Sequence, residues 1–537
     1  MIPCIRLMLS LATVILVLTP AAAVHGQRPG GQNTGVDSTR YVRTTPATDP
    51  VIKAIWSEGM AHGQAMTLAQ VFLDSIGPRL NNSDRFDMGQ RWLIDTYQSW
   101  GIPAKQEQYG TWKKWIRGPT HVDLISPRVR TLEAIQLAWS PSTGNQWVEA
   151  DVVIIPPKTT PAAFAAWLPT AKGKFVLGSA LNPTCRSNAQ VTEFGTEATQ
   201  ARITAERAAN TADYADRFAQ GGNKYSWPAE AGVAGLLTTY FSGYPGIDKI
   251  FGSPQQQVPT IDIGCEDYNL LYRLAQHGQS PRVRLSAQSQ DLGEQPVHNV
   301  IARIEGSEKP NEYIVLSAHY DSWDGATGAT DNGTGTMTMF EAARILKKIY
   351  PHPKRTIIIG HWGGEEQGLN GSRGFAEDHP EIVANVHAGF NQDNGTGRIQ
   401  GVGPGPFVEG TDALVRYLKA LPPEATGQIR MSGMGNPSLG GTDNASFQCL
   451  KSPVYGVGGV SWDYGNTTWH TNRDSFDKVI AEDLQYNATL VAMLVYMADQ
   501  DPKMLSHEVG PYRGRDGAAA DWPACPTSVR DTKSSTR

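Results

Sequence analysis

From about residue 297 to residue 500, short apolar runs alternate with longer amphipathic stretches. The runs HNVIARIEG, EYIVLSAHY, RTIIIGHW, VHAGFNQD and SPVYGVGGV have the length of buried strands, and GTMTMFEAARILKKIY has the apolar spacing of a helix. Strands that alternate with helices indicate an α/β fold, in which a doubly wound, mostly parallel sheet carries helices on both faces. We expect the last helix, within AEDLQYNATLVAMLVYMADQ, to pack against that sheet.

The pattern changes on the N-terminal side of this region. It predicts two helices near 67–76 and 83–99, the second with Ser83 as its N-cap. Further along, short β-like runs alternate with helical stretches without any cluster of candidate ligands, which predicts an inserted, smaller α+β domain. The expected organisation is a signal peptide (1–26), a flexible leader (27–50), a main domain in two pieces (51–124 and 291–500), the inserted domain (125–290) and a C-terminal tail (501–537), poor in apolar residues and expected to be disordered.

The first 26 residues have the pattern of a secretory signal peptide, because Arg6 precedes a long apolar run and small residues follow at 21–23. An uncleaved membrane anchor is the alternative, since the run approaches spanning length. Without the signal peptide no stable membrane span is expected. Export to the periplasm or the extracellular space would leave four cysteines, which allow two disulfides in any of three pairings: Cys185, Cys265, Cys449 and Cys525.

The charge balance excludes some partner classes. Forty-seven basic and fifty-two acidic residues give a net charge of -5, so the chain has no polybasic signature of nucleic-acid or anionic-membrane binding. None of the cysteines has a C-x-x-C spacing, so a thiolate metal site is not indicated. The sequence leaves the oligomeric state open, a homodimer included.

Every predicted strand of the main domain is followed by an imidazole or a carboxylate. In chain order these are His319, Asp321, Asp331, Glu365, Glu366, Asp393 and His470. Singly, each has an ordinary structural explanation, such as a hydrogen-bonded histidine or a solvated glutamate pair. Ligands of open α/β sheets bind beyond the carboxyl ends of the strands, however, and five loops agree there. Mixed nitrogen and oxygen donors suit zinc better than cobalt or manganese, and the set fits two metals that share a carboxylate and a water.

The motifs SAHYDSWDGATGATDNGTGT, GGEEQGLNGS, NQDNG and WHTNRDSFDK resemble those of the co-catalytic di-zinc exopeptidases. That clan includes leucyl aminopeptidases, carboxypeptidase Q and the glutamate carboxypeptidases, and HYDSWDGATGATDNGTG and GGEEQG are most similar to carboxypeptidase Q. The resemblance covers residues 55–500 and implies the zinc-exopeptidase fold. The insertion is similar to the protease-associated domain that often accompanies this fold.

The resemblance implies a role for six residues: His319 binds one zinc ion and His470 the other, Asp331 bridges them, Glu366 and Asp393 complete one site each, and Glu365 is the general base. Asp321 lies two residues from His319 on the same strand face, so we expect it to orient that imidazole. In GGTDNASF, Asn444 stands where the family usually has histidine, which puts a substrate contact there in doubt.

These features predict an exported di-zinc exopeptidase that hydrolyses the terminal peptide bond of short peptides or dipeptides. A strict aminopeptidase acting on longer peptides is the first alternative. A single-zinc enzyme of the glutaminyl cyclase kind and a non-catalytic, receptor-like binding protein are two more. The presence of all six residues favours a two-metal enzyme over these last two.

Overall fold

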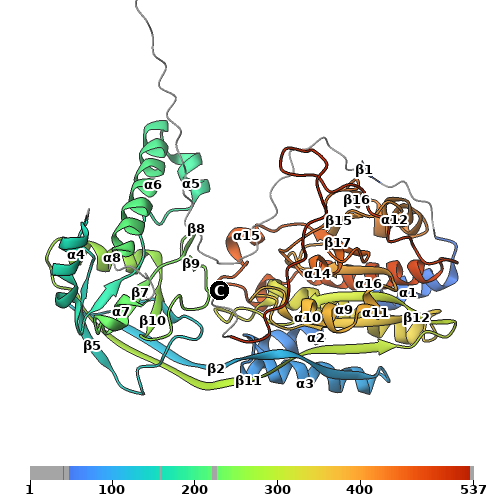
Figure 1. Ribbon diagram of the computed structural model, residues 1–537, viewed down its shortest axis with the longest axis horizontal. Helices are drawn as coiled ribbons and strands as arrows, with labels where there is room; N and C mark the ends of the chain where they lie inside the picture. Colours follow the sequence, from blue (N-terminus) through green and yellow to red (C-terminus); the bar gives the residue numbers. More distant parts are fainter. Residues whose placement is uncertain (1–39, 42–46, 158, 221–225, 533–537) are drawn as a thin grey trace, which may run out of the picture.

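The computed structural model describes residues 40–41, 47–157, 159–220 and 226–532. Figure 1 shows two bodies of unequal size joined by a long ribbon of two strands. The expected signal peptide lies outside the described residues, as does most of the expected leader. Within the described ranges, no helix combines the length and the apolar character that crossing a bilayer requires.

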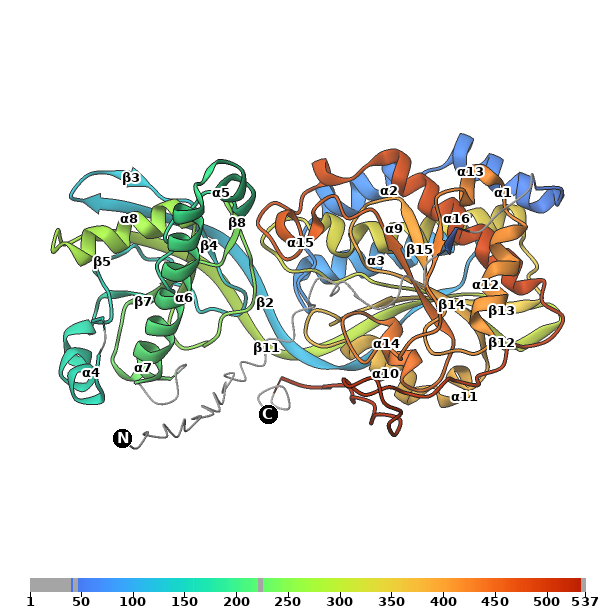
Figure 2. The ribbon, with the colours of Figure 1, turned by 90° about the horizontal axis from the view of Figure 1, so that it is seen from above.

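The ribbon consists of β2 (Ala104–Ser126) and β11 (Arg282–Ile304), which pair antiparallel along almost their whole length. One end of β11 pairs with a strand of the larger body and the other end with a strand of the smaller body. The chain therefore leaves the larger body through β2 and returns through β11, and residues 127–281 between them build the smaller body (Figure 2).

The sheet of the larger body is parallel in its centre and antiparallel at its edges. Its order is β1-β16-β15-β17-β14-β12-β13-β11, and β13, β12, β14 and β17 all run in the same direction. The strands are β1 (Arg40–Tyr41), β12 (Lys309–His319), β13 (Arg355–Trp362), β14 (Val386–Gln392), β15 (Ile399–Val402), β16 (Arg430–Met431) and β17 (Val454–Gly459). The predicted mostly parallel, doubly wound α/β fold is confirmed.

Alternation along the central strands fills the space above and below this sheet. In β12, Ile314 and Leu316 enter one core while Tyr313 and Val315 enter another, because successive side chains of a strand point to opposite faces. The first core is covered by α1 (Pro50–His62), α2 (Ala65–Gln70), α3 (Asp84–Ser99), α9 (Thr334–Ile349), α12 (Gly410–Lys419) and α16 (Ala481–Asp499). The second is covered by α10 (Asn370–Asp378), α11 (Pro380–Val383) and α14 (Asn444–Gln448).

The two helices expected near the N-terminus are present. α2 continues through a wider helical turn over Val71–Ile76, and α3 begins after Ser83, whose hydroxyl accepts a hydrogen bond from the Phe86 amide at 3.1 Å. This is the expected N-cap interaction, which satisfies one of the first amides of the helix. Two short helices, α13 (Pro423–Thr426) and α15 (Tyr464–Thr467), complete the larger body.

The sheet continues from β11 into the smaller body through β5, and the smaller body has cores of its own. Strands β5, β6, β7 and β10 are parallel, and β4 is antiparallel to β10. The elements are β3 (Arg130–Thr131), β4 (Ala134–Gln136), β5 (Val148–Val153), β6 (Phe175–Leu177), β7 (Gly235–Thr238), β8 (Phe241–Tyr244), β9 (Ile247–Asp248), β10 (Thr260–Ile263), α4 (Pro161–Trp167), α5 (Asn188–Phe194), α6 (Glu197–Ala219), α7 (Trp227–Glu230) and α8 (Cys265–Gln276). A disulfide joins Cys185 to Cys265 at the start of α8.

The expectation of a disordered C-terminal tail is wrong over residues 501–532. This segment has almost no regular structure but is tied to the larger body by the disulfide Cys449–Cys525. Near its end, the Arg530 guanidinium forms ion pairs with Glu377 and Asp378 of α10 at 2.9 and 2.8 Å. Composition alone misses this order because a covalent link and a few ion pairs replace an apolar core. The two disulfides are consistent with an exported protein.

Candidate metal centre

The structure brings all seven candidate residues to one edge of the large sheet. His319 is the last residue of β12, the two glutamates follow β13, and Asp393 follows β14 directly. Asp331 lies on the turn that leads into α9, and the loop after β17 carries His470. Because parallel strands point their carboxyl ends at the same edge, the four loops after β12, β13, β14 and β17 meet there.

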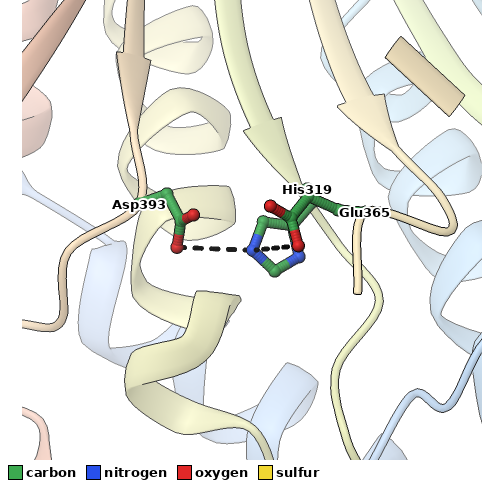
Figure 3. Close-up of side chains that lie close together, drawn as sticks. All are labelled: His319, Glu365 and Asp393. Atoms are coloured by element: carbon green, nitrogen blue, oxygen red, sulfur yellow. Dashed lines mark ion pairs between the residues drawn. The ribbon is translucent and has the colours of Figure 1, made fainter. Parts of the chain in front are cut away.

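The candidate ligand atoms form two groups. One contains His319, Glu365 and Asp393, the other Asp331, Glu366 and His470, and within each group the ligand atoms lie within 4.8 Å of one another. Figure 3 shows the first group, in which dashed lines join the carboxylates of Asp393 and Glu365 to the same nitrogen of the His319 ring.

Asp331 connects the two groups. Its Oδ1 lies 3.5 Å from Nε2 of His319, and its Oδ2 lies 3.2 Å from Nε2 of His470. The two oxygens of one carboxylate therefore face the two imidazoles, one in each group.

The spacing of these atoms fits zinc. Ligands about 2.1 Å from a tetrahedral zinc ion lie roughly 3.4 Å from one another. The Nε2 of His319 is 3.3 Å from Oδ1 of Asp393, and the Nε2 of His470 is 2.9 Å from Oε2 of Glu366. The distance from His319 to Glu365, 3.9 Å, is longer. Glu365 is thus the member of its group whose spacing suits a ligand least.

Buried polar atoms at the site support the same conclusion. Among the described residues, Nε2 of His319, Oδ2 of Asp331 and Oε1 of Glu366 are buried without a hydrogen-bond partner. Such atoms cost free energy unless a cation or a donor satisfies them. Imidazole nitrogen and carboxylate oxygen together are zinc donors, so the residues present fit a zinc centre.

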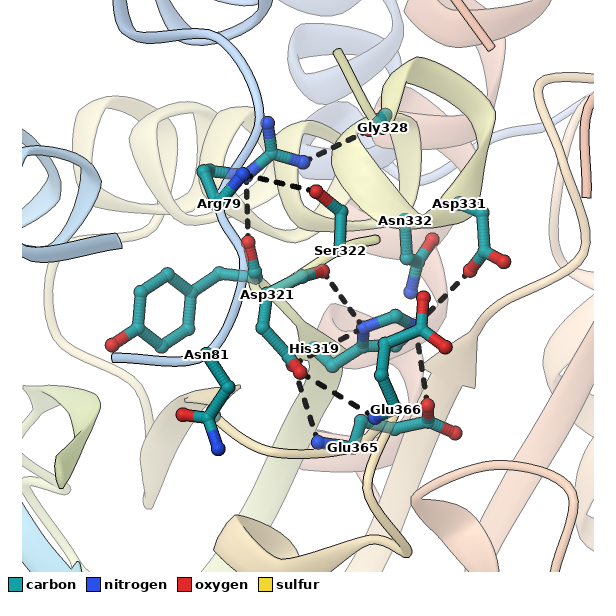
Figure 4. A network of polar contacts seen from close by, with 12 residues as sticks. Arg79, Asn81, His319, Asp321, Ser322, Gly328, Asp331, Asn332, Glu365 and Glu366 are labelled. Carbon is teal, nitrogen blue, oxygen red and sulfur yellow. Dashed lines mark hydrogen bonds and ion pairs between the residues drawn. The ribbon is translucent and has the colours of Figure 1, made fainter. Parts of the chain in front are cut away.

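The His319 ring is held in the orientation that a metal ligand requires. Its Nδ1 lies 3.1 Å from the backbone oxygen of Asp321 and 3.4 Å from the Asp321 carboxylate. A carbonyl oxygen can only accept, so Nδ1 carries a hydrogen and the neutral ring presents the Nε2 lone pair to the site. The Asp321 carboxylate also accepts hydrogen bonds from the amides of Glu365 and Glu366 at 3.2 and 3.4 Å (Figure 4).

The turn that carries Asp331 is fixed by a second buried carboxylate. Asp474 accepts hydrogen bonds from the Thr330 amide and hydroxyl, both at 2.8 Å, and from the Asp331 amide at 3.0 Å. Burial raises the pKa of Asp474 to about 7. Asp474 follows His470 by four residues, so it joins the loops that carry Asp331 and His470, two of the three residues of one group.

A buried arginine supports the same turn. The Arg79 guanidinium is fully buried and donates to the backbone oxygens of Gly77, Tyr320, Thr327 and Gly328 at 2.6–2.9 Å. Burial lowers the pKa of Arg79 to about 10, and the carboxylates of Asp474, Asp321 and Asp331 oppose that shift. Arg79 thereby anchors both the end of β12 and the loop before Asp331.

The protein groups perturb one another strongly. Burial by itself lowers the pKa of His470, but the carboxylates of Glu366 and Asp331 outweigh it and raise this pKa to about 9. Burial raises the pKa of Glu366 to about 7. It also raises the pKa of Asp331, but the adjacent imidazoles of His319 and His470 outweigh it and hold this pKa well below its usual range. The site therefore concentrates negative charge, as a divalent-cation centre does.

Three charged residues near the site were missed by sequence reasoning. Asp474 lies inside a motif quoted above, and Arg79 lies next to the apolar end of a helix, but their partners are distant in sequence. Asp443 is fully buried beside the site, and burial raises its pKa to about 7. Asn444, which replaces the family histidine, is buried at the start of α14.

Residues 299–495 match the sequence profile of Peptidase family M28. Carboxypeptidase Q from Xenopus laevis is 25% identical over 344 residues, which are 63% of this chain and 66% of that protein. A Peptidase M28 precursor from Shewanella amazonensis aligns over 86% of this chain and 98% of its own, with 22% identity and a TM-score of 0.63. BSAP, a zinc aminopeptidase from Bacillus subtilis, covers 81% of this chain and 94% of its own at 18% identity and a TM-score of 0.52.

The α/β sheet, with two groups of histidine and carboxylate side chains at its carboxyl edge, defines the class as a metallopeptidase fold. The profile match makes this assignment more specific: residues 299–495, somewhat more than a third of the chain, match the profile of peptidase family M28. The predicted resemblance to the di-zinc exopeptidase clan, near carboxypeptidase Q, is confirmed at the level of family and fold. The chain spans slightly less than two thirds of the length of this curated relative.

Proposed function

We propose that this chain is an exported di-zinc metallo-exopeptidase that hydrolyses the terminal peptide bond of short peptides or dipeptides. The observation that carries the proposal is the position of Asp331, whose two oxygens each face the Nε2 atom of a different imidazole. A carboxylate shared between two ligand groups is what a two-metal hydrolytic centre requires. The M28 match and the carboxypeptidase Q relatives support the same class of reaction.

In this proposal the ligands of one zinc ion are His319, Asp393 and Asp331, and those of the other are His470, Glu366 and Asp331. Zinc supplies Lewis-acid chemistry, which lowers the pKa of a water molecule and stabilises negative charge on the carbonyl oxygen of the scissile bond. Asp321 holds the His319 ring with Nε2 directed into the site. Asp474 holds the backbone of Asp331.

Glu365 is proposed as the general base. Its Oε2 belongs to the group around His319 but lies 3.9 Å from Nε2 of that histidine. The carboxylate oxygens of the proposed ligands Asp393 and Asp331 lie closer to this nitrogen. A carboxylate in this position reaches a water molecule between the two groups. Glu365 accepts a proton from the attacking water and then delivers it to the amine that leaves.

A single experiment tests the base and the ligands together. With zinc supplied, Glu365→Gln should lower turnover by a factor of roughly 10²–10⁴ while zinc content stays at about two per chain. Asp331→Ala should lose zinc as well as activity. Glu381→Gln, an exposed glutamate of α11, is the matched control. Retained turnover in Glu365→Gln contradicts the base assignment, and unchanged zinc content in Asp331→Ala contradicts the shared ligand.

Peptides with blocked ends test which terminus is trimmed. The wild-type protein is assayed on free, N-blocked and C-amidated dipeptides and tripeptides. Cleavage of an N-blocked peptide excludes a strict aminopeptidase. Cleavage of C-amidated peptides with no cleavage of N-blocked ones supports the aminopeptidase alternative. No hydrolysis of any peptide by the zinc-loaded protein contradicts the proposed function.

We further propose the domain organisation expected from the sequence: a signal peptide, a flexible leader, a peptidase domain of residues 51–124 and 291–500, an inserted domain of the protease-associated kind at 125–290, and a C-terminal tail at 501–537. The course of β2 and β11, which lead into and out of the smaller body, supports this division. The two disulfides support export.

A further inference from the structure

The smaller body contacts the larger one beside the metal centre. The hairpin of β8 and β9, together with the residues that follow it, lies against α15 and the loop that carries His470, and Figures 1 and 2 both show β8 next to α15. Lys249 and Thr471 form an antiparallel β-bridge across this junction. The metal centre is thus continuous with the smaller body through the backbone of one ligand loop.

Backbone hydrogen bonds fix this contact on both sides of His470. The Ile250 amide donates to the His470 oxygen at 2.6 Å, and the Asn472 amide donates to the Asp248 oxygen at 3.1 Å. The Asp248 amide donates to Oδ1 of Asn472 at 3.0 Å. These bonds place a short strand from the smaller body directly against the residue that supplies a metal-binding nitrogen.

The Lys249 side chain connects two points of the loop that carries His470. Its Nζ donates to the backbone oxygens of Gly465 and Trp469 at 2.7 and 2.5 Å. The same Nζ lies 4.4 Å from the centre of the Trp469 ring, and that ring stacks on the His470 ring with 4.0 Å between centroids. An ammonium group on an aromatic face adds a cation–π attraction to the two hydrogen bonds. Phe251 covers the His470 ring from the smaller body at 5.2 Å.

The His470 loop needs such support. Trp462, Asp463 and His470 all have positive φ angles, of 44°, 56° and 54°. Residues other than glycine occupy this left-handed region at a cost in free energy and stay there when their surroundings hold them. Trp462 and Asp463 lie in the exposed part of the loop, and His470 presents its ring to the metal centre. At this third position the Ile250 amide of the smaller body holds the backbone oxygen of His470, in addition to hydrogen bonds within the loop such as that from the Thr471 amide to the Thr468 oxygen.

We propose that Lys249 and the strand around it are positioning elements of the metal centre: the inserted domain holds the His470 loop in the conformation that binds metal. This rests on the proposed function, because it assumes that His470 and Glu366 hold one of two zinc ions. It assigns the inserted domain to one half of the centre. The half that contains His319 and Asp393 lies at the ends of β12 and β14 of the large sheet, with Asp321 and Arg79 beside it.

The test measures zinc affinity, without turnover, in two backgrounds that each keep one half of the centre. The apo full-length chain is titrated with zinc against a chelating dye, with both disulfides oxidised. His319→Ala leaves the half with His470, and His470→Ala leaves the half with His319. Lys249→Met should weaken zinc binding roughly 10–100-fold in the first background and by less than about twofold in the second.

Three further variants separate positioning from folding. Lys249→Arg can still donate to both backbone oxygens and stack on Trp469, so it should restore most of the affinity. Lys172→Met, at an exposed lysine of the inserted domain, is the matched control and should change nothing. Asn472→Ala removes the acceptor of the Asp248 amide and should act in the same direction as Lys249→Met. Far-UV circular dichroism checks that each variant is folded.

Equal losses of affinity in both backgrounds, or no loss in either, overturn the positioning role of Lys249. If Lys249→Met fails to fold, the titration of Asn472→Ala decides by the same criteria. Fewer than two zinc ions on the unmodified wild-type chain contradict the proposed function, and the inference falls with it. Two zinc ions on the wild type with unchanged binding in Lys249→Met contradict the inference alone.

Discussion

Asp248 makes the stability of the junction between the two bodies depend on pH. Its side chain is 1% exposed and accepts a hydrogen bond from the Thr239 hydroxyl at 3.3 Å. Burial raises the pKa of Asp248 to about 7, nearby Glu133 and Glu266 add to the rise, and Arg473 opposes it. The carboxyl of Asp262 is buried close by, and burial also raises its pKa. The folded protein therefore holds a proton on Asp248 that the unfolded chain releases.

The size and the sign of the change in stability with pH follow from the difference between the pKa values of Asp248 in the folded and the unfolded protein. The unfolded carboxyl has a pKa near 3.8, so between pH 3.8 and 7 the folded state binds more protons and stability falls as pH rises. From pH 5 to pH 8 the free energy of unfolding should fall by about 3 kcal/mol on account of Asp248 alone. Asp248→Asn keeps the shape and an acceptor for Thr239, but it cannot ionise. The stability of the variant relative to the wild type should therefore rise by about 3 kcal/mol between pH 5 and pH 8.

The assay is urea unfolding of both proteins at pH 5 and pH 8, followed by tryptophan fluorescence. The wild-type-minus-variant difference is the quantity compared, because other titrating groups and the metal contribute to both proteins and cancel. Asp216→Asn, an exposed residue of α6 in the same body, is the matched control. A difference that is the same at both pH values refutes the reasoning.

Two more substitutions test the support of the metal centre. Arg79→Met leaves buried backbone oxygens without donors and should lower the free energy of unfolding by roughly 3–5 kcal/mol, whereas exposed Arg91→Met should change it little; equal effects in urea unfolding would contradict the anchoring role. Asp474→Asn turns one accepting oxygen into a donor facing the Thr330 or Asp331 amide and should weaken zinc binding roughly tenfold in a chelator titration. Unchanged zinc affinity would show that Asp474 does not hold the Asp331 turn.

The strand ends of the main domain could be predicted because the relevant information is local. Each run such as RTIIIGHW is long and apolar enough to be a buried strand, and its chemistry follows within a few residues. Parallel strands then bring the loops together without any further information. The candidate site was therefore predictable as a set of residues, and its geometry agrees with that set: all seven side chains lie at one sheet edge.

The supporting contacts could not be predicted in the same way. Asp321 was expected to orient His319, and it does lie beside that ring, but its carboxylate also accepts from the amides of Glu365 and Glu366, 44 and 45 residues away in sequence. Lys249 lies more than 200 residues from the loop that it contacts. Such pairs leave no periodic pattern in the chain. The ordered tail was missed because the pairing of Cys449 with Cys525 was one of three possibilities.

The acidic residues at the sheet edge fall into two kinds, and the difference explains how the site can be both acidic and buried. Asp321 and Asp474 accept hydrogen bonds from backbone amides, so their negative charge is compensated by the fold itself. Asp331 and Glu366 each have a buried oxygen with no such donor among the described residues: Oδ2 of Asp331, which faces Nε2 of His470, and Oε1 of Glu366, whose other oxygen faces the same nitrogen. The fold therefore satisfies the carboxylates that shape the loops and leaves unsatisfied those that a cation would bind. Adjacent glutamates can follow one buried strand because Glu366 belongs to the group around His470, while Glu365 belongs to the group around His319.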